Sequence, residues 1–118
     1  MGETTLKNDS PPSIVQEFAE RQPDVWNAYN QLGEAVSRSG PLDAKTQRLL
    51  KLAIAVGSGR EGAVRAHTRR GLRAGLTIEE LEQVALLGIT TTGWPSAFAA
   101  RCWICEAAEK EAARSHDV

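Results

Sequence analysis

Apolar side chains recur along this chain at helical spacing, and no segment shows the alternation of polar and apolar residues that is typical of a strand. Prolines, glycines and capping residues divide the pattern into about six segments. The expected helices cover about residues 13–22, 23–38, 44–56, 60–74, 78–87 and 96–113. The sequence therefore predicts an all-α fold of about six helices.

Local chemistry sets most of the expected helix borders. Pro23 ends one helix and suits the first turn of the next, where its missing N–H costs nothing. Asp43 is placed to cap the third helix, and Thr77–Glu80 matches a capping box. Gly75 stands where a helix often ends in a left-handed residue. The third helix is nearly all apolar from Leu49 onward, so we expect it to be buried on most sides.

Composition narrows the class of protein. A chain of 118 residues is most simply one domain, expected over residues 13–113, with a flexible N-terminus at 1–12 and a tail at 114–118. The net charge of −1 argues against nucleic acid as a partner, and no apolar run is long enough for a membrane span. Two cysteines without an export signal predict a cytoplasmic location.

His67 is the candidate for proton transfer. The helical projection of residues 60–74 places it in the middle of a face of small residues, opposite Arg65, Arg69 and Arg73. A core histidine that links two helices and a functional histidine both fit this position. The arginine stripe is interpreted as a solvated face, or as a surface that pairs with acidic residues of another subunit.

The segments LDAKTQRLLKLAIAV and HTRRGLRAGLTIEELEQVALLGITTTGWPSAFAA resemble the carboxymuconolactone decarboxylase family, which belongs to the alkyl hydroperoxidase D-like superfamily. The resemblance covers about residues 40 to 110. It implies an all-helical fold that assembles into homo-trimers or homo-hexamers. It also implies an active site in the cleft beside His67, often near a subunit interface.

Two chemistries occur in the superfamily. The peroxidase branch carries a Cys-x-x-Cys ahead of the histidine and a glutamate on the preceding helix. These positions correspond here to Arg60, Ala63 and Arg48, so thiol peroxidase activity at this site is not expected. The decarboxylase branch, a lyase, lacks those cysteines and acts on an anionic lactone. By that resemblance, His67 would serve as the acid–base group on a small anionic metabolite, with Arg48 and Arg60 as anion contacts.

Two other functions stay open. The first is a non-catalytic, ligand-binding relative in which the pocket is kept without the chemistry. The second is antioxidant thiol activity of the peroxiredoxin type, through the Cys-x-x-Cys of Cys102 and Cys105. That pair lies about two turns inside the expected last helix, where the helix dipole no longer lowers a thiol pKa, so two small buried hydrophobes are the simpler interpretation. No cofactor is expected, and the cysteines and histidines make no zinc spacing.

Overall fold

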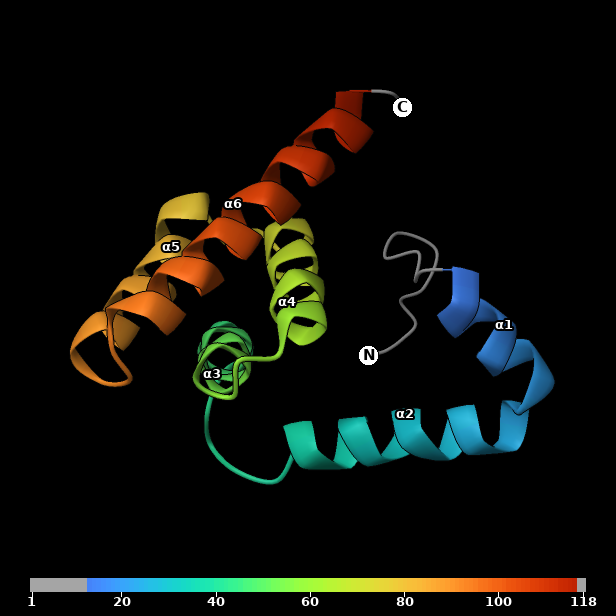
Figure 1. Cartoon of the computed structure of the whole chain (residues 1–118). Coiled ribbons are helices and arrows are strands. Elements are labelled where there is room, and N and C mark those ends of the chain that lie inside the picture. Colours follow the sequence, from blue (N-terminus) through green and yellow to red (C-terminus); the bar gives the residue numbers. More distant parts are fainter. Residues whose placement is uncertain (1–12, 117–118) are drawn as a thin grey trace. The chain divides into compact units, whose positions relative to one another are not determined.

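The computed structural model describes residues 13–116, and every regular element in that range is a helix (Figure 1). The helices are α1 (Ser13–Arg21), α2 (Pro23–Ser37), α3 (Ala44–Gly57), α4 (Glu61–Arg73), α5 (Ile78–Leu87) and α6 (Trp94–His116), with a short 3₁₀ helix η1 (Gly88–Thr90) after α5. The predicted all-α class with about six helices is confirmed. None of the described helices is long and apolar enough to cross a membrane. The expected flexible segment 1–12 lies outside the described residues.

The chain divides into two compact units, Met1–Leu42 and Asp43–Val118. In the first unit α1 contacts α2, with the rings of Phe18 and Trp26 meeting edge to face at a centroid distance of 6.5 Å. None of the residues of α1 or α2 is buried. The division does not test the single domain expected over residues 13–113, which stays a prediction.

The predicted helix starts are present, and those of α3 and α5 are held by capping hydrogen bonds. Pro23 opens α2, and the Asp43 carboxylate accepts a hydrogen bond of 2.8 Å from the Thr46 N–H at the start of α3. Thr77 and Glu80 form the complete capping box of α5. These contacts span three residues each, so the local sequence is enough to specify them.

The last helix is longer than the sequence pattern predicted. α6 begins at Trp94 rather than Ser96, directly after Gly93 with a φ of 105°. It continues to His116, beyond the predicted end at residue 113. Pro95 fits inside the first turn, where no helical hydrogen bond from its nitrogen is required.

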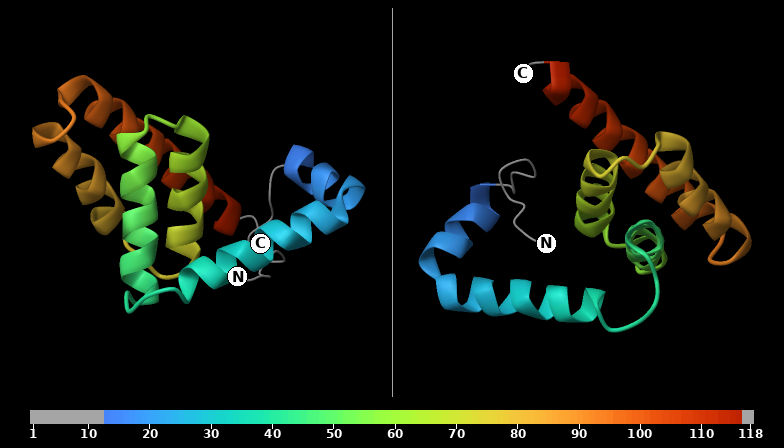
Figure 2. Two further views of the ribbon diagram at one scale, coloured as in Figure 1. Left: turned by 90° about the horizontal axis from the view of Figure 1, so that it is seen from below. Right: turned by 180° about the vertical axis from the view of Figure 1, so that it is seen from behind.

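The hydrophobic core of the second unit lies among α3, α4, α5 and α6. α6 packs along both α4 and α5, whereas α3 and α4 run side by side as an antiparallel pair (Figures 1 and 2). The largest fully buried side chains are Leu52, Val64, Thr68, Leu81 and Ile104. The expectation that α3 is buried on most sides is wrong. Leu50 and Ile54 are 45% and 68% exposed, because α4 and α5 cover only the opposite side of the helix.

Candidate functional site

The site around His67 is built on the α3–α4 pair. The residues of α4 that are fully packed inside the unit are Val64, Thr68 and Gly71, and His67 lies at the edge of that face, half-buried. The histidine therefore lies beside the fully buried residues of α4, where Arg48 and Lys51 of α3 act on it. Thr68 and Gly71, and not His67, occupy the tightest part of the packing.

Glycines allow α4 to approach α5 and then turn. A Cβ on Gly71 would lie 3.1 Å from Leu76 Cδ1 and 3.3 Å from Leu81 Cδ2, which is closer than side-chain carbons normally pack. Gly75, with a φ of 100°, takes the left-handed conformation that ends the helix. Gly71 lets α4 pack closely against the start of α5, and Gly75 ends α4 directly before it. Because His67 lies four residues before Gly71, this packing fixes the position of the histidine.

Burial and positive charge together shift the titration of His67. Burial is the larger cause and lowers the pKa of the imidazole from 6.5 to about 4, with further lowering by Arg70, Lys51 and Arg48. The described charges that act on the ring are all cationic, and the ring forms no hydrogen bond within residues 13–116. At neutral pH the site is therefore an uncharged imidazole in a field of positive charge.

This arrangement brings together only part of the predicted set. Arg48 lies on α3 close enough to act on His67, whereas Arg60 is the N-cap residue of α4, two turns before the histidine, and is exposed. Sequence reasoning missed Lys51 and Arg70. Helical spacing could have indicated both, because Lys51 follows Arg48 by three residues and Arg70 follows His67 by three.

Two arginines of the α4 stripe, Arg65 and Arg73, pair with glutamates of the same chain, which corrects the expectation of a solvated face for these two residues. Arg65 binds Glu61 on its own helix at 2.9 Å and Glu106 of α6 at 2.7 Å. Arg73 donates two hydrogen bonds, of 2.7 and 3.0 Å, to Glu111 of α6, and both side chains are only 14% exposed. Arg65 and Arg73 therefore bind α4 to α6.

The second cysteine motif lies on α6, apart from His67. Cys102 and Cys105 are free thiols, and both are partly buried. Burial raises the pKa of Cys105, the opposite of what a nucleophilic thiolate needs. Among the described residues no three His, Cys, Asp or Glu side chains gather in a group that could hold a metal ion. The structural interpretation of the two cysteines thus has the better physical support.

Comparison with known proteins decides the family. The sequence model of the Carboxymuconolactone decarboxylase family matches residues 23–106, from the start of α2 into α6. The chain belongs to this family. It is 31% identical over 85 residues to an uncharacterised protein of Methanocaldococcus jannaschii, a match that covers 72% of this chain and 79% of the relative. A similar match, 32% identical over 80 residues, links it to an uncharacterised protein of Cupriavidus necator and covers 68% and 71% of the two chains.

Solved structures show the same fold. A carboxymuconolactone decarboxylase family protein from Legionella pneumophila superposes with a TM-score of 0.70 at 23% identity, over 84% of this chain and 88% of that one. A putative carboxymuconolactone decarboxylase from Burkholderia xenovorans gives a TM-score of 0.64, also at 23% identity, over 92% and 90% of the two chains. At this level of identity the likeness establishes the family fold and leaves the chemistry to the residues of the site.

Proposed function

We propose that the α3–α4 pair of this carboxymuconolactone decarboxylase family member binds a small carboxylate-bearing metabolite, such as an anionic lactone, beside His67. The observation that carries the proposal is the field at the imidazole, where the described charges from Arg48, Lys51 and Arg70 are all positive. Guanidinium and ammonium groups are the usual contacts of a carboxylate. Arg60 lies further along α4 and would contribute at longer range.

His67 then serves as the group that moves a proton. Its ring is neutral at pH 7, so one nitrogen can accept a proton, but burial and, to a smaller degree, the surrounding cations lower its pKa and make it a weak base. A bound carboxylate offsets the cationic part of this shift and so raises the pKa of His67, while the effect of burial remains. Binding of the anion would therefore strengthen the base when the substrate is present, which suits acid–base chemistry.

Isothermal titration with malonate tests the binding step. We expect Arg48→Ala and Lys51→Ala to weaken malonate binding, whereas Lys110→Ala, which removes an exposed cation from α6, leaves it unchanged. Arg60→Ala measures the longer-range contribution. Equal affinity of the wild type, Arg48→Ala and Lys51→Ala would refute the site.

A separate assay tests the chemistry. Release of carbon dioxide from carboxymuconolactone by the wild type, and its loss in His67→Gln, is the result expected of a decarboxylase-like lyase. Binding of the lactone with no release of carbon dioxide would instead support the non-catalytic, ligand-binding alternative. No geometry favours the thiol alternative, because Cys105 has a raised pKa and lies on α6.

We also propose that the chain works as a homo-oligomer, a trimer or a hexamer, in the cytoplasm. The support comes from α2, where four large apolar side chains spaced by four, three and four residues are each more than half exposed: Val25, Tyr29, Leu32 and Val36. This spacing is that of a helix seam that packs against another helix. Sedimentation as a monomer at micromolar concentration would contradict the oligomer.

A further inference from the structure

The end of α5, the 3₁₀ helix η1 and the first turns of α6 form a corner of the second unit, drawn in orange in Figure 1. Four large apolar side chains of this α5–α6 corner are each between 45% and 62% exposed: Leu86, Leu87, Trp94 and Phe98. The rings of Trp94 and Phe98 stack at a centroid distance of 5.2 Å, so they are ordered before anything binds. An exposed apolar cluster of this kind is typical of a contact surface.

A hollow in the corner has the size of one side chain rather than of a metabolite. Its volume is about 250 Å³, below the range of about 300–1,000 Å³ that is usual for small-molecule sites. Leu87 follows Leu86 on α5, does not line the hollow, and is the most exposed of the four apolar side chains. The corner therefore offers both an exposed leucine and an apolar recess, which is lined by Leu86, Ile89, Trp94, Ala97, Phe98 and Arg101.

The corner is also free of unpaired charge. No residue in the range 83–100 has an ionisable side chain, and this is the longest such run in the chain. Arg101, which lines the hollow, pairs with Glu82 at 2.7 Å. Three hydroxyl groups of the corner donate to main-chain carbonyls of their own chain: those of Thr91, Thr92 and Ser96. The surface thus requires neither an ion pair nor a hydrogen bond from its partner.

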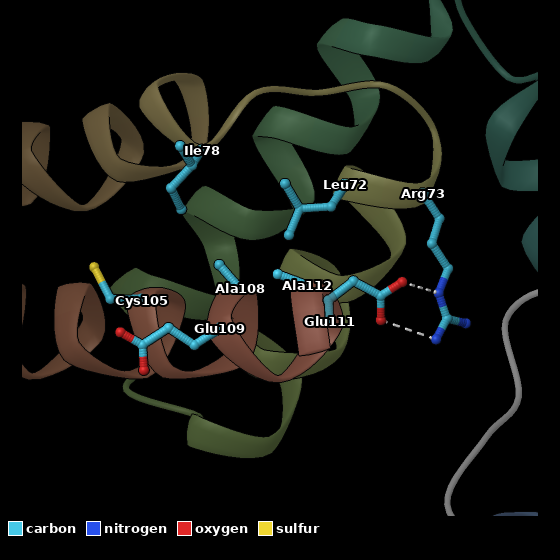
Figure 3. Close-up of a pocket in the computed structure, with 8 residues that line it drawn as sticks. All are labelled: Leu72, Arg73, Ile78, Cys105, Ala108, Glu109, Glu111 and Ala112. Atoms are coloured by element: carbon cyan, nitrogen blue, oxygen red, sulfur yellow. Dashed lines mark hydrogen bonds and ion pairs between the residues drawn. The ribbon is translucent and has the colours of Figure 1, made fainter. Parts of the chain in front are cut away.

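This lack of charge favours a second copy of the same chain as the partner. A two-fold contact uses one surface twice, so a charged group near the axis meets its own like charge. The larger groove among α4, α5 and α6 is less suited to such a contact, because three charged side chains line it: Arg73, Glu109 and Glu111 (Figure 3). A different protein, in turn, is usually selected by complementary charge, and the corner has no unpaired charge for such a partner to recognise.

We propose that the α5–α6 corner is a two-fold contact between copies of this chain, in which Leu87 of one copy enters the hollow of the other. The proposal rests on the homo-oligomer proposed for this chain and narrows it to the hexamer. A trimer with three-fold symmetry has no two-fold axis, whereas a hexamer built from two trimers has one between them. The exposed apolar seam of α2 would then serve within each trimer, and the corner would join the two trimers.

Sedimentation velocity of the full chain at micromolar concentration tests the contact. The wild type should sediment as a hexamer and Leu87→Glu as a trimer. The new carboxylate would have to enter the apolar recess of the partner, which should weaken the two-fold contact at least about a hundredfold. Ala113→Glu adds the same charge at an exposed position outside the corner and should remain hexameric. Circular dichroism checks that the helices are intact, as expected because Leu87 is largely exposed in the single chain.

Trp94→Ser is a second, independent variant. It removes an aromatic anchor from the corner and leaves a residue that suits the start of a helix. The loss of a buried aromatic anchor should weaken the two-fold contact about thirtyfold, so the hexamer should form only at a correspondingly higher protein concentration.

The possible failures point to different proposals. A hexamer that survives in Leu87→Glu would overturn the two-fold contact and leave the corner to another partner, while the homo-oligomer would stand. A trimeric wild type would also overturn the contact, because three-fold symmetry does not contain it. A monomeric wild type would overturn the homo-oligomer as well. None of these results bears on malonate binding at His67, since the two sites share no residue.

Discussion

Removing the His67 imidazole should change how the stability of the protein depends on pH. The replacement His67→Gln keeps a polar side chain of similar size at the half-buried position on α4 but cannot titrate. In the wild type the folded protein disfavours the imidazolium ion, chiefly because the ring is buried and secondly because Arg70, Lys51 and Arg48 repel a further charge. Unfolding exposes the ring to water and allows it to take up a proton.

The magnitude follows from the two pKa values. The unfolded ring titrates near 6.5 and the folded ring near pH 4, so the contribution of His67 to stability is fully present above pH 6.5 and is lost as the pH falls through that interval. The two pKa values differ by about 2.5, and each pKa unit corresponds to about 1.36 kcal/mol. The total loss of stability on acidification is therefore about 3 kcal/mol. About 2 kcal/mol of it falls between pH 7 and pH 5.

Urea denaturation at pH 7 and pH 5, at one fixed protein concentration and in buffers without carboxylate or phosphate, measures the effect. The carboxylates titrate in both proteins, so the difference between wild type and His67→Gln isolates the histidine. Between pH 7 and pH 5 the wild type should lose about 2 kcal/mol more than the variant. Lys51→Met should show an intermediate loss, because removing one cation raises the pKa of His67.

An equal loss of stability by the wild type and His67→Gln would refute the reasoning. It would mean that the ring titrates alike in the folded and unfolded states, so that neither burial nor the cations act on it as described. NMR titration of the His67 ring measures the same pKa independently. We expect a midpoint near pH 4, and a midpoint near pH 6.5 would contradict the lowered pKa.

Three further predictions concern stability, each measured by urea denaturation at pH 7. Thr68→Val should raise the free energy of unfolding by about 1 kcal/mol, because the buried Thr68 hydroxyl has no hydrogen-bond partner among the described residues; a loss of stability would contradict this. Glu111→Gln should lower the free energy of unfolding by about 1–2 kcal/mol, because it breaks the largely buried pair with Arg73. Glu61→Gln, in an exposed pair with Arg65, should lower it by less than about 0.5 kcal/mol. Equal losses in the two variants would show that burial of the pair is unimportant. Thr77→Ala should cost about 1 kcal/mol through loss of the capping box, and an unchanged midpoint would argue against that role.

The site could be predicted only in part. The sequence placed His67 on a helix after the apolar α3 and argued against thiol chemistry there, because Arg60 and Ala63 occupy the positions of the family's cysteines. Helical spacing places Lys51 on the same side of α3 as Arg48, but whether that charge acts on the ring depends on the distance between α3 and α4, which only the structure gives. Nor did the sequence show that Arg73 pairs with Glu111, which lies 38 residues later.

The sequence by itself determined the local structure of this protein. Pro23, Asp43 and the Thr77–Glu80 capping box act through contacts within a few residues, so their chemistry fixes the helix ends wherever the helices pack. Only the tertiary structure decided which sides of those helices are covered and which charges meet. The positive field at His67 and the ion pair between Arg73 and Glu111 both arise between helices, because burial and Coulomb interactions depend on distance in space.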